Sequence, residues 1–287
     1  MSVRISIVTP SFNQGRFLEE TIRSVLSQRD HVHEYFVIDG GSTDSSVDVI
    51  RKYEDGIDRW VSDRDRGQSD AIDKGFRLAT GDVLFWLNSD DVLLPNALER
   101  VQQAFDQNPD WDVLTGYSVW IDAASRILKM HRVPRESIDW LSWGIIHVCQ
   151  QTCFFRRALY HAVGRLDLGL HCTMDTELWC RMLKHGARWG HIPEYLGGFR
   201  RHCDMKGRTW TERYAAEGSL LRSRFPEFFG GRARVAAGTV AYRAAQLASG
   251  RYLKARLDTL GKKRRPLSEV FGEWDVPESR CHLTSYS

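Results

Sequence analysis

The sequence lacks the patterns that would assign several common classes of protein. None of its apolar runs approaches the roughly eighteen residues of a spanning helix, and Met1 leads directly into a strand-like segment without a basic leader. The six cysteines form no CxxC pair, which favours reduced thiols over a disulfide framework or a structural zinc site. No GxGxxG follows a strand-like run, which argues against a dinucleotide oxidoreductase. We therefore expect a cytoplasmic chain with no signal peptide and no membrane span.

Net charge is small but unevenly distributed. The 287-residue chain carries +3 overall, yet residues 208–265 hold fourteen Lys and Arg against four acidic side chains, a local balance of +10 that leaves −7 for the rest. The two parts are expected to meet different partners. Three interpretations of the basic part stay open: a solvated helical face packed on the remaining chain, a surface attracted to the anionic inner leaflet of the cell membrane, or a nucleic-acid arm. We rank the nucleic-acid arm last and expect no nucleic-acid partner.

Strand-like runs alternate with amphipathic helical stripes over the first hundred residues. Strands are predicted at 5–8, 35–38, 59–62 and 83–87, each followed by a helix, the last of which starts at Pro95 and ends near 108. Repeated β-α units predict an α/β fold with a mostly parallel sheet covered on both faces, which binds ligands at the carboxyl ends of its strands. Further along, strands are predicted at 113–117 and 127–131, a helix at 176–185, and mainly helices after about 208.

Acidic residues stand at the ends of three predicted strands: Asp39, Asp65 and the adjacent pair Asp90 and Asp91. They should converge on one cleft, where four carboxylates require solvent, separation or a cation. Oxygen ligands favour a hard ion, Mg²⁺ or Mn²⁺, bound together with substrate phosphates. The alternative is that Asp90 and Asp91 only cap the helix that Pro95 opens.

Six blocks of sequence, in order and at similar spacing, resemble glycosyltransferase family 2. They are "IVTPSFNQGRFLEETIRSVLSQ", "VIDGGSTDSSVDVIRKY", "SDRDRGQSDAIDKGFRLATGDVLFWLNSDD", "QQTCFFRRALYHAVGRLD", "MDTELWCRMLKHG" and "FRRH", within residues 3–205. The resemblance implies an inverting, nucleotide-sugar-dependent transferase with the GT-A fold. It implies a single Rossmann-like catalytic domain at 1–207, with a nucleotide-sugar-binding half at 1–110 and an acceptor-facing half at 111–207. A basic helical region at 208–265 and an irregular tail at 266–287 complete the expected organisation.

The resemblance also implies a donor-binding set in the first half of the chain. Its members are Thr9, Pro10, Ser11, Asn13, Asp39, Asp65, Arg66, Lys74, Asn88, Ser89 and Asp90. Within this set, Asp39 would accept a hydrogen bond from uracil or thymine, which favours UDP- or dTDP-sugar donors. Arg66 and Lys74 would approach diphosphate or sugar oxygens, although solvated surface charges explain them equally well.

The implied metal site departs from the family pattern at one position. Asp90 and Asp91 match the DxD-type region that holds diphosphate and cation, and His202 aligns with a histidine that in some relatives adds a metal ligand or diphosphate contact. A lone histidine is also often structural. Asn88 stands where many members have the first aspartate, which removes one negative charge. The cation, Mn²⁺ or Mg²⁺, must then rely on Asp90, Asp91 and the substrate.

Asp175 in "MDTELW" matches the family's catalytic base. Inversion needs a base opposite the leaving diphosphate to take the proton of the acceptor hydroxyl. Glu177 is two residues away and cannot share that helix face, so only one of the two serves as base, and we favour Asp175. The alternative is that both residues only stabilise the N-terminus of the helix through their negative charge. The candidate acceptor contacts are Trp140, Trp143, Gln150 and Gln151. For the two tryptophans, packing in the core is the alternative.

We therefore expect a glycosyltransferase that moves a sugar from a nucleoside diphosphate to a hydroxyl of a glycan or lipid-linked acceptor, in polysaccharide biosynthesis. The processive-synthase signature QxxRW is missing, which argues against a polymerising enzyme. One rival is a nucleotidyltransferase or pyrophosphorylase, which would need a Gly-rich phosphate loop where "TPSFNQGRF" has one glycine. The other is a catalytically silent nucleotide-sugar or glycan-binding protein, with Asn88 and Asp73 as signs of drift.

Overall fold

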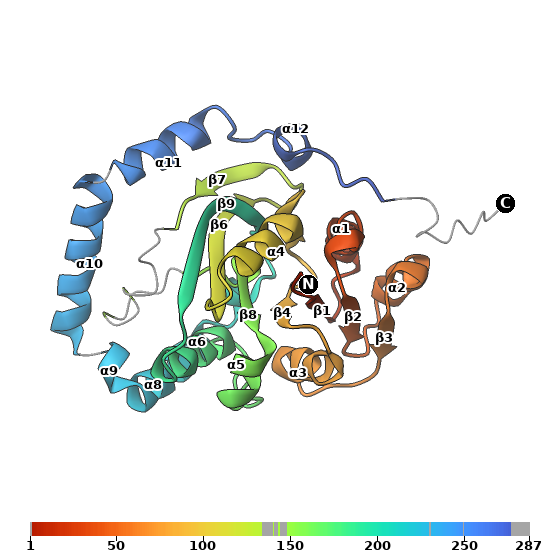
Figure 1. Cartoon of the computed structure of the whole chain (residues 1–287), viewed down its shortest axis with the longest axis horizontal. Coiled ribbons are helices and arrows are strands. Elements are labelled where there is room, and N and C mark those ends of the chain that lie inside the picture. Colours follow the sequence, from red (N-terminus) through yellow and green to blue (C-terminus); the bar gives the residue numbers. More distant parts are fainter. Residues whose placement is uncertain are drawn as a thin grey trace.

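In the described part of the chain, nine strands form one sheet that carries helices on both faces (Figure 1). The computed structural model describes residues 2–133, 140, 143, 148–229, 231–248 and 250–276. The strands are β1 (Ile5–Ser11), β2 (Glu34–Asp39), β3 (Arg59–Ser62), β4 (Val83–Trp86), β5 (Val92–Leu93), β6 (Val113–Ile121), β7 (Ile127–His131), β8 (Cys153–Arg156) and β9 (Trp189–Arg200).

The strand order separates a parallel half from a mixed half. The sheet runs β3-β2-β1-β4-β8-β6-β9-β5, with β7 paired to β6. β1 pairs in parallel with β2 and β4, and β2 with β3, as the repeated β-α units predict. β8 then enters antiparallel between β4 and β6, while β6 and β9 run parallel. The parallel half brings the carboxyl ends of β1, β2 and β4 to one edge, and the α/β fold class is confirmed.

The helices cover the sheet and continue beyond it. Within the described residues, short 3-10 helices include those at Arg29–His31, Glu54–Gly56 and Gln150–Thr152. The α-helices are α1 (Gly15–Leu26), α2 (Ser46–Lys52), α3 (Gln68–Leu78), α4 (Ala97–Gln107), α5 (Arg157–Ala162), α6 (Met174–Lys184), α7 (Lys206–Thr209), α8 (Thr211–Arg224), α9 (Pro226–Phe229), α10 (Arg232–Ala248), α11 (Arg251–Leu260) and α12 (Leu267–Phe271).

Strand β4 shows how the two faces are built. Alternate side chains of a strand point to opposite sides. Leu84 and Trp86 join the apolar cluster under α3, α5 and α6, and Val83 and Phe85 join the cluster under α1, α2 and α4. All four side chains are fully buried, so the strand that leads to Asn88 is fixed on both sides.

Strand β9 was not anticipated from the sequence, because its twelve residues contain Pro193 and three glycines. The pairing of β9 with β6 shifts register between Thr115, opposite His191, and Tyr117, opposite Tyr195. Pro193 lies in this irregular stretch, where its missing N–H removes no regular ladder hydrogen bond. A strand can therefore contain a residue that normally argues against one.

The first part of the C-terminal region packs against the helices on one face of the sheet, and the rest runs away from it. Leu221 and Phe225, from α8 and the residue after it, are buried in the same cluster as α3 and α6. From α9 to α12 the chain then runs along the outer edge of the molecule (Figure 1). Among the described residues, no helix has the length and apolar character needed to cross a bilayer.

The expectation of an irregular segment from 266 is wrong at 267–271, where α12 forms. Leu267 is buried with Val92 and Ile127 in a third apolar cluster, and this burial stabilises the helix. Residues 277–287 of the expected tail lie outside the described residues.

Candidate functional site

A cavity of about 990 Å³ opens at the carboxyl ends of the parallel strands. Its walls come from the loops that follow β1, β2, β3 and β4, and they are completed by the start of α6 and by residues that follow β9. The lining includes Pro10–Gln14, Gly40, Gly41, Asp65, Gln68, Trp86, Asn88–Asp91, Cys149–Gln151, Met174, Asp175, Arg200, Asp204–Gly207, Trp210, Arg213 and Tyr214. Loops that are far apart in the sequence thus enclose one space.

Three buried polar atoms of this lining find no hydrogen-bond partner within the part of the chain that the structure describes. They are Oγ of Ser11, Oε1 of Gln14 and Nε1 of Trp86. Ser11 and Trp86 are almost fully buried, and buried polar groups are normally paired. Three residues of the lining thus each carry a polar atom that is buried and unpaired within the described fold.

The loop after β1 has a defined shape. Asn13 adopts a left-handed backbone conformation with φ of 52°, and its Oδ1 accepts a hydrogen bond of 2.9 Å from the Thr43 backbone N–H. Phe12, which lies between the predicted contacts Ser11 and Asn13, is 60% exposed and lines the cavity. Thr9 is instead fully buried in β1, where its hydroxyl pairs with the Tyr35 hydroxyl at 3.1 Å, so its role is in the core.

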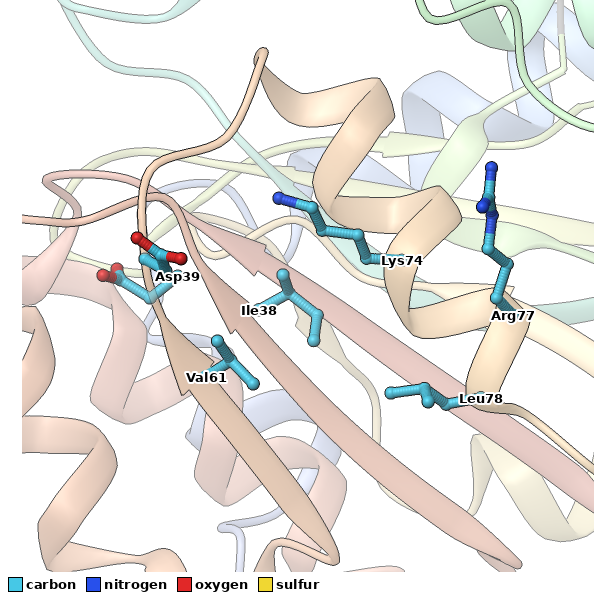
Figure 2. A pocket seen from close by; sticks show the side chains of 7 residues that line it. Ile38, Asp39, Val61, Lys74, Arg77 and Leu78 are labelled. Carbon is cyan, nitrogen blue, oxygen red and sulfur yellow. The ribbon is translucent and has the colours of Figure 1, made fainter.

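Asp39 is fully buried at the end of β2 and organises the loop that follows. Its carboxylate accepts hydrogen bonds from the Gly41 and Ser42 backbone N–H groups and from the hydroxyls of Ser42 and Ser62. The side chain lines a smaller hollow of about 320 Å³, and the neighbouring residue Gly41 lines the larger cavity. Figure 2 shows Lys74 reaching from α3 toward the strand end that carries Asp39. Asp39 thus fixes the shape of the β2 loop.

The two predicted basic contacts pair with a carboxylate that the sequence interpretation left out. Arg66 and Lys74 lie 3.0 and 3.2 Å from the carboxylate of Asp70, and Arg66 is 72% exposed. Asp65 does line the larger cavity. Burial raises the pKa of Asp65, and nearby negative charges add to that rise. The hydrogen bond from the Gly67 N–H acts in the opposite direction but is outweighed.

Asn88 belongs to a chain of side-chain amides across the cavity floor. Its Oδ1 accepts a 2.6 Å hydrogen bond from Gln68, and its Nδ2 donates to Oε1 of Gln150 at 3.1 Å. Gln150 in turn donates to the backbone oxygen of Trp86 at 2.6 Å, and Lys206 donates to Oε1 of Gln68 at 2.5 Å. The departure from the family pattern is therefore matched by neighbours that suit an amide at this position.

Asp90 lines the cavity, and its carboxylate pairs with the buried imidazole of His202. Nε2 of His202 lies 3.0 Å from Oδ2 of Asp90, and Nδ1 lies 3.0 Å from the Arg16 guanidinium. A guanidinium can only donate, so Nδ1 accepts and Nε2 carries the proton toward Asp90. Holding a cation would therefore require Nε2 to release this proton, after which the pair offers one oxygen and one nitrogen, a set that Mn²⁺ accepts. The residues present fit a cation that draws its remaining ligands from a bound diphosphate.

Asp91 has a structural role. It is almost fully buried, and its Oδ1 accepts a 2.9 Å hydrogen bond from the backbone N–H of Arg200. Burial raises the pKa of Asp91 well above its usual value, and the adjacent charge of Asp90 adds to the rise. Within the described residues, no group of three or more His, Cys, Asp or Glu is arranged to hold a metal. We therefore leave Asp91 out of the proposed ligand set.

Asp175 lies at the second residue of α6 and faces the cavity. Its Oδ1 accepts a 2.6 Å hydrogen bond from the backbone N–H of Thr176. Burial raises the pKa of Asp175 despite this bond, and the negative charge of Glu217 adds to the rise. Glu177, the alternative base, is buried and holds the Arg181 guanidinium with both oxygens. Of the two, Asp175 has the position and the environment of a base.

The cavity has a wall that sequence analysis missed. Lys206, Trp210, Arg213 and Tyr214 line it, although all but Lys206 belong to the region expected to be an appendage. Lys206 is half-buried, its partial burial lowers its pKa, and its Nζ donates to Gln68 as described. No local sequence pattern distinguished these residues from a solvated basic helix. The C-terminal region therefore forms part of the site.

Glu217 connects that wall to the start of α6. Its carboxylate accepts hydrogen bonds of 2.8 to 3.0 Å from the backbone N–H groups of His171, Cys172 and Thr173, which directly precede α6. Arg213 donates to the same carboxylate at 3.2 Å. A side chain of α8 thus holds the backbone that leads into the helix of Asp175.

The candidate acceptor residues divide into two groups. Gln150 and Gln151 line the cavity. Trp140 packs edge-on against Tyr242 of α10, with ring centroids 5.4 Å apart, and Trp143 lies against Gly238 of the same helix. Because both rings contact α10, we assign them to packing and remove them from the acceptor set.

Comparison with known proteins gives a consistent family. Residues 6–164 match the model of glycosyl transferase family 2, which is more than half of the chain. An uncharacterized glycosyltransferase of Nostoc sp. is 33% identical over 181 residues, 58% of this chain and 54% of that protein. A PGL/p-HBAD biosynthesis glycosyltransferase of Mycobacterium bovis is 27% identical over 194 residues, 65% of this chain and 73% of that protein. The chain thus spans little more than half the length of the Nostoc relative.

Two solved structures are similar in fold. S. aureus TarS 1-349 in complex with UDP-GlcNAc superposes with a TM-score of 0.64 at 16% identity, over 96% of this chain and 82% of that one. The mannosyltransferase PcManGT from Pyrobaculum calidifontis, in complex with GDP-Man and Mn²⁺, gives 0.57 at 18% identity, over 88% and 81%. These similarities confirm the GT-A fold.

Proposed function

Because the chain belongs to glycosyltransferase family 2, we propose that it moves a sugar from a nucleoside diphosphate to a hydroxyl of a glycan or lipid-linked acceptor. One observation carries the proposal: the same cavity is lined by Asp175, a carboxylate with a raised pKa, and by Asp90, whose carboxylate pairs with the His202 imidazole. This arrangement offers a candidate base and a candidate phosphate-and-cation site in one space.

The donor is proposed to lie with its nucleoside along the loop after β1. Phe12 lines the cavity and offers an exposed ring on which a base can stack. TarS was solved with UDP-GlcNAc and PcManGT with GDP-Man, which supports a nucleoside diphosphate sugar as the class of donor. We retain UDP- or dTDP-sugars as the favoured donors, with Asp39 shaping the loop beside the base.

The diphosphate is proposed to lie between Asp90, His202 and Lys206. Lys206 supplies a half-buried positive charge, and Asp90 and His202 would hold a divalent cation, Mn²⁺ or Mg²⁺. When bound, that ion would neutralise charge on the departing diphosphate. The side-chain amides of Asn88 and Gln68, which are hydrogen-bonded to each other, would contact polar groups of the donor next to the diphosphate.

Asp175 is proposed as the general base of an inverting transfer. A carboxylate whose pKa is raised accepts a proton more readily than an ordinary aspartate, and the acceptor hydroxyl must lose its proton as it attacks the sugar. The Thr176 N–H fixes one carboxylate oxygen. The acceptor hydroxyl would approach over Gln151 and Tyr214, which line the cavity.

The test is Asp175→Asn, with Asp110→Asn as the matched control. Asp110 is an exposed carboxylate paired with Arg188 and is not part of the cavity lining. UDP binding, measured by calorimetry with Mn²⁺, should stay within about twofold for both variants. Release of nucleoside diphosphate in the presence of a panel of glycan and lipid-linked acceptors should fall by about 10² to 10⁴ for Asp175→Asn alone.

Two outcomes would contradict this proposal. Retained transfer by Asp175→Asn would remove Asp175 as the base. Binding of UDP-, dTDP- or GDP-sugars by the native chain without transfer or hydrolysis above background would favour the silent binding protein instead.

A further inference from the structure

The helices on the outer edge of the molecule expose an unusual set of apolar side chains. We call this surface the leucine face. Its five residues are between 59% and 69% exposed. They are Val240, Leu247, Leu253, Leu257 and Leu260. Val240 and Leu247 lie on one side of α10, and the three leucines of α11 follow the i, i+4, i+7 spacing of a single helical stripe.

Helix α11 turns its polar side toward the protein and its apolar side toward solvent, which is the reverse of an ordinary surface helix. Such a helix buries its apolar stripe and exposes its polar residues. Here the polar side faces the protein: Asp258 forms an ion pair with Arg132, and the Thr259 hydroxyl accepts a 3.1 Å hydrogen bond from the Met130 backbone N–H in β7. The leucines point the other way. Packing against β7 therefore explains the polar side of α11 and leaves the apolar side without a function in the fold.

The same segment is strongly basic. Residues 231–265 contain ten Lys and Arg and a single acidic residue, Asp258, which is already paired with Arg132. Lys254 and Lys263 are exposed beside the leucine stripe. An occupant of this surface must therefore supply both an apolar phase and negative charge.

We propose that the leucine face docks on an anionic lipid surface. A basic helix with a projecting apolar stripe is the arrangement that inserts into the boundary between lipid headgroups and acyl chains. A second copy of the chain would bring the same positive charge to the contact, and the two copies would repel each other. Helices α10 and α11 also form the outer rim in Figure 1, where a flat surface can reach them. Because α11 is fixed to β7, docking would hold the sheet and its cavity at a set orientation to the lipid.

The direct test is sedimentation of the full chain with vesicles of phosphatidylcholine, with and without phosphatidylglycerol. Binding is expected only to the anionic vesicles and should weaken as salt is added. The triple variant Leu253→Ser, Leu257→Ser and Leu260→Ser should lower the partition coefficient by at least about tenfold, because each leucine loses its apolar contact. Replacing Lys254 and Lys263 with glutamine should lower it by about tenfold or more as well.

The matched control is Leu220→Ser on α8, an exposed leucine outside the leucine face. It should leave vesicle binding unchanged, and all variants should keep the native melting temperature since the replaced side chains are exposed. Failure to bind anionic vesicles, or equal binding by the triple variant and the native chain, would overturn the proposal. So would a dimer that forms without lipid and is lost in the triple variant, which would assign the face to a second copy.

Discussion

Replacing Glu217 with glutamine separates the contribution of α8 from that of Asp175, the proposed base. The native carboxylate accepts hydrogen bonds from the backbone N–H groups of 171–173 and from Arg213. Burial alone would raise the pKa of Glu217, but these donors outweigh it and hold the pKa below its usual value. The side chain is therefore charged in the folded protein at neutral pH. Glutamine keeps the shape, removes the charge and turns an N–H₂ group toward donors.

The expected loss of stability follows from the number of contacts. A hydrogen bond to a charged group contributes about 1.5 to 3 kcal/mol, and glutamine retains one acceptor oxygen. With water replacing part of what is lost, Glu217→Gln should lower the free energy of unfolding by about 2 to 4 kcal/mol and the melting temperature by roughly 5 °C. A displacement of the start of α6 by about 1 Å would lower kcat by about 10- to 100-fold.

The pH profile distinguishes positioning from a purely structural role. The negative charge of Glu217 raises the pKa of Asp175, so its removal should lower that pKa. A base acts when it is deprotonated, and the acid limb of kcat should therefore shift to lower pH in Glu217→Gln. A purely structural residue would reduce kcat across the profile without moving the limb.

The matched control is Glu227→Gln, which removes an exposed glutamate paired with Lys184 at 2.9 Å. An exposed ion pair contributes about 0.2 to 1 kcal/mol, so this variant should show neither the loss of kcat nor the shift. If Glu217→Gln matches the control in melting temperature, kcat and pH limb, the assignment of Glu217 as a positioning residue is wrong.

Three further variants probe the donor end of the cavity. Asn88→Asp should lower the melting temperature without metal, because a carboxylate would face Oε1 of Gln150; Mn²⁺ should then raise the melting temperature of the variant more than that of the native chain, and equal rises would contradict the proposed cation site. Lys206→Met should weaken UDP binding by about tenfold in calorimetry and leave uridine binding unchanged, since a half-buried charged donor is lost; equal weakening would exclude a phosphate contact. Phe12→Ala should weaken UDP and uridine alike, by about 1 to 3 kcal/mol, and an effect on neither would refute base stacking.

The parts of the fold that sequence predicted well depend on local patterns. β3 (Arg59–Ser62) and β7 (Ile127–His131) have the predicted bounds, and α6 starts two residues before its predicted start. Alternating apolar runs and helical stripes are properties of neighbouring residues, so a single segment is enough to detect them. The strand-end acids followed from the same reasoning, since the position of Asp90 depends only on where β4 ends.

The missed parts depend on contacts between distant segments. Glu217 bonds a backbone about 45 residues earlier, and backbone N–H groups leave no mark in the sequence of the side chain that binds them. The exclusion of Asp91 from the cation site likewise depends on the N–H of Arg200 in β9. Thr9 matched the donor loop in sequence, yet β1 extends to Ser11 and buries it. In each case the tertiary partner, which no local pattern contains, decides the role.

The bond between Glu217 and residues 171–173 also limits how this chain can be recombined with relatives. The family match ends at residue 164, so a chimera that exchanges acceptor specificity would naturally be joined after it or near the predicted boundary at 207. A junction at 207 would take Glu217 from one parent and the backbone before α6 from the other. A functional graft should therefore keep residues 165–229 from a single parent, as one exchangeable module that carries the proposed base and the helix that holds its backbone in place.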